Sequence, residues 1–558
     1  MRIVLRALLA SSFLLLPSGI PSYAHAHGRL ASVIPRGDRL DREQRARLEE
    51  LAAAAREGRP EARRAAVVKL ARFGARDAWR LVVAALGDAS GQVADEAAWL
   101  LAELEDSSVW SDLYGGDGLA SRDELVRLRV AEAVGRQRGS VDGGELVRRL
   151  TRSDPRLSRR LLWSIERLAS AGRLVGKPST ILGALESEYR SAREEGTRAA
   201  ALCAFAAAAP LSPEPRARER LERAVRQAYG DRAPELRSAA LLALGALDAS
   251  EQRARALAAL EDPARAVRLQ AIEVLRTGPD RTVALALAER LASEETDRVA
   301  WRIVDSLRAT SGLRHRRDPR PWRDWANGLP EDWLGNALTL DEGAEPEGRS
   351  RASFGGLPVV SDALCFLVDF SGSLWFERSD GSVRKTFADR LLKQALEALP
   401  PEARFNVIPY TGVPHPWRPA LVPATEENVR DALAWFEACT ERGSGNVYDA
   451  ARLALDDPAV DSIVCLTDGA PTGGAHWKLE LIVPLLVEAM RFRRIAFDSV
   501  LIDAPARLAR HWAELARLTG GRSLAIDDAD ARVPQSPRED SQSPRDEDDA
   551  AGRRRRKN

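Results

Sequence analysis

The chain contains, at residues 363–373, the sequence ALCFLVDFSGS. Its first six residues are apolar, and a short continuous apolar run is typical of a strand that is buried on both faces of a parallel sheet. Asp369, Ser371 and Ser373 follow where this strand ends, around Gly372, which permits a sharp loop. Carboxylate and hydroxyl oxygens are hard ligands of the kind that Mg²⁺ takes. The stretch therefore predicts a buried strand with a candidate cation site at its carboxyl end.

Strand-like and helix-like patterns alternate from residue 361 onward. Further strands are predicted at 405–410, 462–467, 497–502 and 523–526, and helices at 386–399, 426–438, 447–455, a long one that directly follows Asp468-Gly469 and ends near 493, and one ending at 518. This order predicts a doubly wound, Rossmann-like α/β domain, in which ligands bind beyond the carboxyl ends of the strands. Asp369 and Asp468 both lie at such ends.

Four motifs in this region resemble those of a von Willebrand factor type A (vWA) domain. They are DxSxS at 369–373, GNVYDA at 445–450, LTDGAPT at 466–472 and LTGG at 518–521, and the resemblance covers residues 357–528. In that family a metal-ion-dependent adhesion site (MIDAS) holds Mg²⁺, with one position open for a carboxylate of the partner protein. The resemblance implies that Asp369, Ser371 and Ser373 are ligands or supports in the first loop. It implies that Asp468 is the second carboxylate, commonly acting through water, and that Mn²⁺ or Ca²⁺ can replace Mg²⁺.

The sequence departs from the family pattern at one ligand position. The family usually has Gly-Thr-Asn before the Tyr-Asp-Ala helix, whereas this chain has Ser444-Gly445-Asn446. Gly445 therefore stands in the place of the Thr and has no side-chain oxygen. Either Ser444 supplies a hydroxyl after a shift of one residue, or water fills the position. Because Mg²⁺ keeps several waters in its shell, this departure weakens the expected site without excluding it.

The N-terminal half contains a repeated unit that begins with an acidic or Pro-containing turn. An aliphatic residue, an Arg and then Ala and Leu at helical spacing follow, and successive copies begin 31 to 40 residues apart. Clear copies lie at 126–135, 236–245 and 267–275, and weaker ones begin near residues 62, 93, 157, 197 and 299. This period predicts an α-solenoid of paired helices. The form Asp-Pro-x-x-x-Val-Arg-x-x-Ala at 262–271 resembles HEAT repeats, and the resemblance covers residues 42–311.

The surface of this array has two interpretations. Arg-rich pairs such as Arg63-Arg64 and Arg148-Arg149 are interleaved with acidic residues, which favours a solvated helix surface. The concave side of a solenoid can instead bind a partner. Residues 312–356 are predicted to form a cap, with Trp322 and Trp325 on one face of a short helix, followed by a linker rich in Gly, Pro and Glu.

The two ends of the chain indicate export and disorder. Residues 1–26 combine Arg2 and Arg6 with a short apolar core and small residues, a pattern that predicts a secretory signal peptide cleaved after Ala24 or Ala26. Residues 529–558 are almost devoid of apolar residues and are predicted to be a disordered charged tail. No other stretch is long and apolar enough to span a membrane. The expected location is the periplasm or the exterior of the cell.

The remaining residues exclude several functions. The net charge of +1 gives no overall preference for nucleic acid. Cys365 and Cys465 lie in strand-like runs and are expected to be buried free thiols. His415, His476 and His511 have no Cys or His partners at ligand spacing, and the His476-Trp477 pair favours a surface or packing role.

The sequence thus predicts an exported, non-catalytic protein that binds an acidic side chain of a partner through Mg²⁺, with the solenoid as scaffold. One alternative is a structural scaffold with a degenerate metal site. A metal-dependent hydrolase is the other, but a general base, a second metal site and an activated nucleophile are all missing from the motifs.

Overall fold

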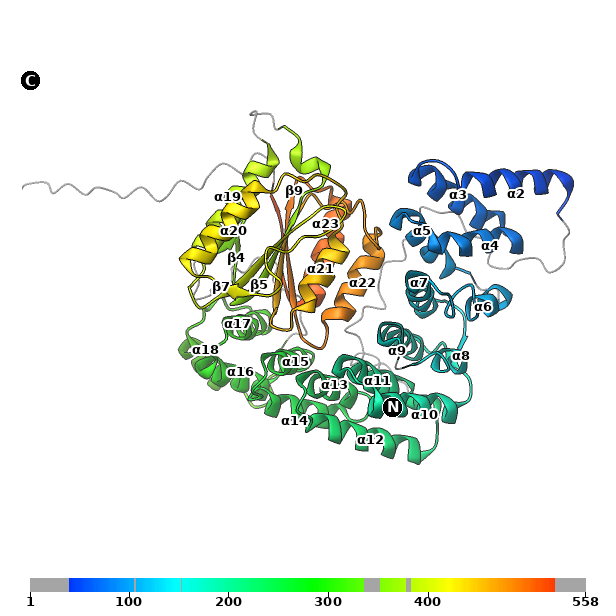
Figure 1. The fold of residues 1–558 in the computed structure, drawn as a ribbon. Helices are drawn as coiled ribbons and strands as arrows, with labels where there is room; N and C mark the ends of the chain where they lie inside the picture. The colour runs from blue at the N-terminus through cyan, green and yellow to red at the C-terminus, as the bar shows by residue number, and fades with distance from the viewer. Residues whose placement is uncertain (1–39, 105–106, 152, 336–351, 378–382, 527–558) are drawn as a thin grey trace, which may run out of the picture.

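The structure, a computed structural model, describes residues 40–104, 107–151, 153–335, 352–377 and 383–526. The predicted signal peptide, the charged tail and much of the linker lie outside these residues. The described residues form a helical array that curves around a C-terminal α/β domain (Figure 1). Among them, no helix has both the length and the apolar character that crossing a membrane requires.

The helical array has an inner row of helices beside the α/β domain and an outer row facing away from it (Figure 1). The inner row comprises α3 (Pro60–Phe73), α5 (Gly91–Leu101), α7 (Glu124–Gly135), α9 (Pro155–Ser170), α11 (Glu195–Ala208), α13 (Pro234–Leu244), α15 (Arg265–Leu275) and α17 (Asp297–Ser311). The outer row comprises α4 (Arg76–Ala84), α6 (Ser107–Leu113), α8 (Gly143–Val147), α10 (Pro178–Ser191), α12 (Pro215–Tyr229), α14 (Ala249–Ala259) and α16 (Arg281–Ser293), and α2 (Arg42–Ala54) precedes both rows. Short 3₁₀ turns and a two-stranded pairing complete it: η1 (Ala85–Gly87), η2 (Ala209–Leu211), β1 (Val141–Asp142) and β2 (Leu174–Val175).

The Arg of the repeated unit joins successive turns of the array. Arg237, on α13, donates to Asp262 in the next turn at 2.7 and 2.8 Å and to the carbonyl of Asp231 in its own turn at 2.9 Å. Arg127 does the same with Asp154 and the Ser121 carbonyl. The same pairing recurs between Arg63 and Asp88, Arg198 and Asp231, and Arg268 and Glu294. The acidic turn and the Arg recur at one period because each pair spans one repeat.

This arrangement is solenoid-like, and the sequence prediction of a helical repeat array is confirmed at that level. That the units are HEAT repeats stays a prediction. After α17 the short helix α18 (Pro319–Asn327) packs on the end of the array. Trp322 is fully buried there and meets Trp325 edge to face at 6.0 Å between ring centroids.

The α/β domain is built on a six-stranded sheet within the described residues, in the order β10-β9-β8-β5-β6-β7. Neighbouring strands are parallel except β7, which is antiparallel to β6. The strands are β5 (Ala363–Asp369), β6 (Arg404–Tyr410), β7 (Val422–Pro423), β8 (Ser462–Thr467), β9 (Ala496–Ile502) and β10 (Ser523–Ile526), with a small hairpin of β3 (Ser353–Phe354) and β4 (Leu357–Pro358) beside them. Every residue of β5 and β8 is buried, as their apolar runs predict.

Helices cover both faces of this sheet. One face packs against α19 (Arg384–Glu397) and α20 (Glu426–Ala438), and the other against α21 (Val447–Asp456), α22 (Leu479–Met490) and α23 (Ala506–Thr519). This confirms the doubly wound α/β prediction. Cys365 and Cys465 are buried and free, also as predicted. Because α19 and α22 leave adjacent strands toward opposite faces, the carboxyl ends of β5 and β8 form the topological switch point.

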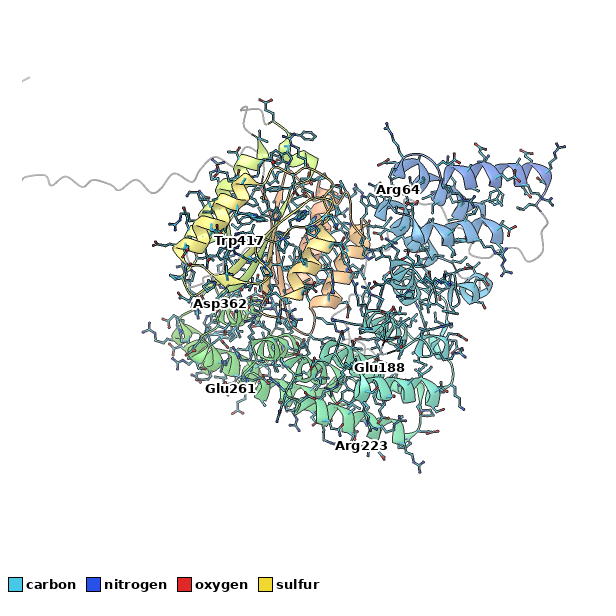
Figure 2. The ribbon with its side chains drawn as sticks, in the orientation of Figure 1. Arg64, Glu188, Arg223, Glu261, Asp362 and Trp417 are labelled. Atoms are coloured by element: carbon cyan, nitrogen blue, oxygen red, sulfur yellow. The ribbon has the colours of Figure 1, made fainter. Side chains whose placement is uncertain are left out.

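The concave side of the array, which the sequence analysis considered for an external partner, is occupied by the chain's own α/β domain (Figures 1 and 2). The two parts interlock: Trp163 of α9 is buried in the core of the α/β domain, and Phe492, just after α22, is buried in the core of the array. Arg159 pairs with Glu488 at 2.8 Å and Arg491 with Glu166 at 2.9 Å between them. These charged residues on the inner helices thus form ion pairs in the interface between the array and the α/β domain and do not form a solvated surface.

The Arg pairs singled out in the sequence differ from one another in this respect. Arg63 is mostly buried in its pair with Asp88, and Arg64, labelled in Figure 2, lies 4.8 Å from the ring of Trp477 in the α/β domain. Arg148 is 62% exposed, as a solvated surface requires, whereas Arg149 donates to the Tyr114 carbonyl. The solvated interpretation therefore fails for the first pair.

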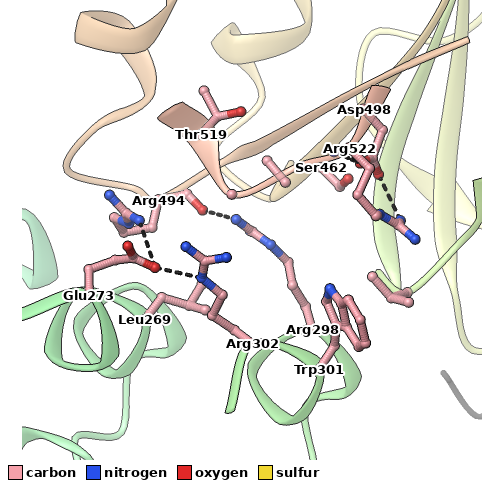
Figure 3. Close-up of a pocket in the computed structure, with 13 residues that line it drawn as sticks. Leu269, Glu273, Arg298, Trp301, Arg302, Ser462, Arg494, Asp498, Thr519 and Arg522 are labelled. Carbon is pink, nitrogen blue, oxygen red and sulfur yellow. Dashed lines mark hydrogen bonds and ion pairs between the residues drawn. The ribbon is translucent and has the colours of Figure 1, made fainter. Parts of the chain in front are cut away.

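At the amino ends of the strands, array and sheet meet in what we call the amino-end contact, made by Glu273, Arg298 and Arg302 of the array with Asp461 and Arg494 of the α/β domain. Arg298 donates to the Asp461 carbonyl at 2.6 Å and to the Arg494 carbonyl. Glu273 accepts from Arg302 at 2.5 Å and lies 3.5 Å from Arg494 (Figure 3). The pocket between them has a volume of about 20 Å³. That is room for about one water, so the contact is a packed junction.

Candidate metal site

Asp369 ends β5 at the switch point and is 3% exposed. Its Oδ1 accepts from the backbone N–H of Ser371 at 2.8 Å, and its Oδ2 accepts from the hydroxyl of Thr467, the last residue of β8, at 2.9 Å. Thr467 Oγ1 in turn accepts from the Gly469 N–H at 3.0 Å. The two strand-end loops are therefore joined through the Asp369 carboxylate.

Hydroxyls connect Asp369 with Asp468, the second predicted carboxylate. Ser371 Oγ and Ser373 Oγ lie 3.0 Å apart, and Ser373 donates to Asp468 in a short hydrogen bond. Gly372 donates its N–H to the Gly443 carbonyl at 3.1 Å, which ties the first loop to the loop before α21. The structure thus brings Asp369, Ser371, Ser373 and Asp468 together at the carboxyl edge of the sheet.

The electrostatics of this group favour a cation. Burial and, after it, the charge of nearby Asp468 raise the pKa of Asp369 to about 6, although hydrogen bonds from Ser371 and Thr467 act to lower it. Two carboxylates that repel each other in a buried setting are stabilised when a divalent ion lies between them. The donor set of two carboxylates and two serine hydroxyls fits Mg²⁺ in kind.

The group differs from a His- or Cys-based metal centre. Within the described part of the chain, no cluster of three or more His, Cys, Asp and Glu side chains is arranged to hold a metal ion. The candidate site is composed of hydroxyls as well as carboxylates and needs oxygen-preferring ions. Asp369, Ser371, Ser373 and Asp468 are the residues that would hold such an ion.

The loop before α21 places Gly445 directly against this group. A Cβ at position 445 would lie 3.3 and 3.4 Å from the two carboxylate oxygens of Asp369 and 3.5 Å from Thr472 Oγ1. Gly445 also donates its N–H to Thr472 Oγ1 at 2.6 Å and accepts from the Thr472 N–H at 3.0 Å. The position facing Asp369 is therefore bordered by the hydroxyl of Thr472, which lies in the loop after Asp468. We call the loop after Asp369 the first loop, the loop before α21 the second loop and the loop after Asp468 the third loop.

Ser444, the predicted substitute for the missing Thr, lies against other groups. A Cβ on Gly412 would be 3.4 Å from Ser444 Oγ, and one on Gly473 would collide with it. Its hydroxyl thus packs among backbone atoms of the neighbouring loops. Asn446 is buried, and its Oδ1 accepts from the Asp449 N–H at 3.3 Å at the start of α21.

The loop after Asp468, residues 469–478, is held by the helical array. Asp95 of α5, fully buried, accepts from the backbone N–H groups of Trp477 and Lys478 at 2.6 and 3.0 Å, and its Oδ1 lies 2.9 Å from His476 Nδ1. Arg129 of α7 donates to the Ala475 carbonyl at 2.7 Å. We call this set, Asp95 and Arg129 with residues 475–478, the carboxyl-end contact. It fixes the start of α22 close to the candidate site.

The ionised form of Asp95 is favoured in this position. Burial by itself would raise the pKa of Asp95, but the charge and hydrogen bond of His476, the Lys478 N–H and the charge of Arg129 outweigh it and hold the pKa below its ordinary value. A negative charge at the N-terminus of α22 is also favourable to the helix dipole.

Sequence reasoning missed three residues around the site. Thr467 and Thr472 belong to the LTDGAPT motif at 466–472, but the family pattern predicts no role for their hydroxyls. Asp95 belongs to a helix far from the site in sequence, and only the acidic pair Asp95-Glu96 in a largely apolar segment of α5 could have drawn attention to it. His476 is buried and pairs with Asp95, so its predicted packing role is borne out as a contact with the array.

Comparison with known proteins supports the assignment of the C-terminal region. Residues 362–524 match the von Willebrand factor type A domain family model. The mouse inter alpha-trypsin inhibitor heavy chain 4 is 32% identical over 130 residues, covering 21% of this chain and 13% of that protein. The human von Willebrand factor A domain-containing protein 3B is 26% identical over 173 residues, covering 31% of this chain and 12% of that protein. The chain thus spans only about an eighth of the length of these relatives and is similar to them in its C-terminal vWA domain.

Solved structures give weaker likenesses. A von Willebrand factor type A protein from Catenulispora acidiphila is 18% identical, with a TM-score of 0.26, and covers 30% of this chain and 38% of its own. An aerotolerance-related membrane protein from Bacteroides fragilis is 15% identical, with a TM-score of 0.24, and the match covers 30% of this chain and 93% of that protein. Likenesses this weak do not bear on function.

Proposed function

We propose that this protein is an exported, non-catalytic binding protein, whose vWA domain uses a divalent cation to bind an acidic side chain of a partner protein. The observation that carries the proposal is the pair of carboxylates at the switch point, Asp369 and Asp468, joined through Ser371 and Ser373. A cation there, Mg²⁺ or alternatively Mn²⁺ or Ca²⁺, neutralises the pair and keeps a position for an outside carboxylate. The similarity to proteins that contain vWA domains supports an interaction role.

The rim of the candidate site adds a second feature to the expected partner. Phe376, shortly after Ser373, is 67% exposed, and Val413, in the loop after β6, is 62% exposed. Both lie on loops at the carboxyl edge of the sheet, where Thr411 and Gly412 neighbour Gly443 and Ser444. A partner that covered these two side chains would remove apolar surface from water, which favours binding. The partner segment is therefore expected to carry an acidic residue with an apolar neighbour.

The helical array acts in this proposal as an internal scaffold for the vWA domain. Its concave side is already filled, so the outer row of helices is the array surface left for other contacts. Export is part of the proposal and rests on residues 1–26. N-terminal sequencing of the protein recovered from culture should show cleavage after Ala24 or Ala26, and a retained Met1 would contradict it.

Cation titration of the full-length protein tests the proposal. Wild type should bind Mg²⁺ and Mn²⁺ in the millimolar range or tighter by calorimetry, and Asp369→Asn should abolish binding. Asp503→Asn is the matched control, because Asp503 also directly follows a strand, but its carboxylate pairs with Arg384 at 2.8 Å. Wild type that binds neither ion at millimolar concentration would refute the cation mechanism and favour the alternative, a scaffold with a degenerate site, which Gly445 suggests.

A further inference from the structure

The candidate site lacks one hydroxyl that the vWA pattern supplies from the loop before α21. Gly445 occupies that position, and a Cβ there would point at both oxygens of Asp369, 3.3 and 3.4 Å away. The shorter of these distances is slightly tighter than ordinary van der Waals contact, so a side chain at position 445 would lie directly against the Asp369 carboxylate.

Thr472 borders the same space from the third loop. Its Oγ1 would be 3.5 Å from the Cβ of residue 445 and accepts the Gly445 N–H at 2.6 Å. The Thr472 N–H donates to the Gly445 carbonyl at 3.0 Å. These two hydrogen bonds, one to the Thr472 side chain and one from its backbone N–H, hold the hydroxyl beside the place where the missing side chain would begin.

Ser444 is the other hydroxyl near this position. Its Oγ is enclosed by Gly412 and Gly473, and a Cβ on Gly473 could not be accommodated next to it. Thr472, by contrast, is exposed. A hydroxyl oxygen has two lone pairs, so Thr472 Oγ1 can accept from Gly445 and still offer a lone pair to an ion.

We propose that Thr472 supplies the hydroxyl that Gly445 lacks, so that the third loop contributes a ligand which the vWA pattern takes from the second. The proposal rests on the cation function proposed above. Threonine hydroxyls are established ligands of Mg²⁺ in proteins, so the exchange conserves the chemistry while it changes the loop.

The origin of the ligand has a structural consequence. The third loop leads directly into residues 475–478, which Asp95 and Arg129 hold against the array. A Cβ on Gly91, at the start of α5, would collide with the Gly474 carbonyl, so the array approaches this loop as closely as backbone allows. A ligand at Thr472 is thus placed by the array as well as by the sheet.

Mg²⁺ and Mn²⁺ affinities of full-length variants test the proposal. Thr472→Val keeps the shape but removes the hydroxyl and should weaken binding about tenfold or more, while Thr472→Ser should stay within about twofold of wild type. Ser444→Ala is the matched control and should bind like wild type. Wild-type affinity in Thr472→Val would overturn the proposal, and a loss confined to Ser444→Ala would assign the hydroxyl to Ser444. Absence of binding in wild type would instead refute the proposed function itself.

A second experiment separates a ligand from a merely structural hydroxyl. Thr472→Ala frees space beside position 445, so the double variant Thr472→Ala/Gly445→Thr returns a hydroxyl to the site from the second loop. We expect it to recover at least about half of the lost binding free energy, measured by calorimetry and by the Mn²⁺ electron paramagnetic resonance spectrum. A double variant no better than Thr472→Ala would show that only the hydrogen bond to Gly445 was lost, and would overturn the proposal.

Discussion

The helical array holds the two ends of the vWA sheet by different means. At the carboxyl-end contact, a single buried carboxylate, Asp95, binds backbone N–H groups of the loop that follows Asp468. At the amino-end contact, one arginine of the array, Arg298, donates to the carbonyls of Asp461 and Arg494, which precede β8 and β9. Glu273 of the array pairs with the side chains of Arg302 and Arg494.

This difference distinguishes a contact that only stabilises the fold from one that also positions the candidate metal site. The amino-end contact reaches the starts of strands, far from the switch point, so its loss should affect stability alone. The carboxyl-end contact reaches the loop that carries Asp468 and Thr472, so its loss should affect stability and cation affinity together. Variants at the two ends can therefore show whether the array tunes the site or only supports the fold.

Acid should weaken both contacts, and we expect the resulting loss of thermal stability to be the largest of the effects predicted for this protein. Burial opposes ionisation of Asp95, Glu273 and Glu488, but basic partners outweigh it, and the pKa of each carboxyl lies below its ordinary value. A group with a lowered pKa stabilises the fold fully above its unfolded pKa of about 4 and loses that contribution as pH falls further. The melting temperature should thus rise somewhat from pH 7 to about 5, because Asp369, whose pKa is raised to about 6, takes up a proton in the folded state there, and it should fall steeply below about pH 4.

The same titration of Asp95→Asn/Glu273→Gln provides the comparison. This variant should start with a lower melting temperature and show a shallower decline in acid, because two of the titrating groups are gone. An equally steep decline would place the acid-sensitive carboxylates elsewhere.

Glu273→Ala should give the largest loss of stability among single substitutions at the interface. It leaves Arg302 and Arg494 buried without their shared carboxylate, and breaking a buried ion pair in this way costs about 3–5 kcal/mol. Chemical denaturation measures the loss, and Mg²⁺ affinity should remain that of wild type. Glu251→Ala is the control, because Glu251 makes an exposed ion pair with Arg255 on α14, and its removal should be nearly silent. A weakened Mg²⁺ affinity in Glu273→Ala would remove the distinction between the two ends.

Asp95→Ala should cost less stability but also weaken the site. Loss of the carboxylate leaves the N–H groups of Trp477 and Lys478 without their acceptor, at a cost of about 2–3 kcal/mol. Hydrogen exchange of residues 470–478 should accelerate, and Mg²⁺ affinity should fall several-fold. Glu96→Gln is the matched control, since Glu96 lies on the same helix but pairs with the side chain of Lys478, at 3.1 Å, rather than with the backbone N–H groups that Asp95 binds. Faster exchange with unchanged affinity would mean that the array supports the loop without tuning the site.

The sequence predicted the centre of the sheet well and its surroundings poorly, for physical reasons. β5 is an apolar run that ends in Asp369, and β8 is a largely apolar run directly followed by Asp468, so both strands and the carboxylates at their ends could be located. β7 is only two residues long, and β3 and β4 are equally short, too short for any periodicity.

The start of α22 shows why long-range contacts escape such reasoning. The helix was predicted to follow Asp468-Gly469 directly, but it begins at Leu479. Residues 470–478 form a loop instead, because their polar backbone groups bind Asp449, Asp95 and Arg129. Asp95 and Arg129 belong to helices that lie 382 and 346 residues earlier in the chain than the residues they bind. No local pattern encodes these partners. The filled concave side of the array was missed for the same reason, since Arg and Glu alternate alike on solvated and on paired surfaces.

Arg64→Ala should have the smallest effect and tests the outer edge of the carboxyl-end contact. The Arg64 guanidinium lies 4.8 Å from the Trp477 ring centroid, and a partly exposed cation–π contact of this kind contributes about 0.5–1 kcal/mol. Arg255→Ala is the control, because Arg255 lies 5.0 Å from the Tyr229 ring within the array and bridges nothing to the vWA domain. Both variants should lose similar stability, but only Arg64→Ala should speed hydrogen exchange in residues 475–478. Equal exchange in the two variants would show that Arg64 does not help to fix this loop, and that α3 lies beside the vWA domain without holding it.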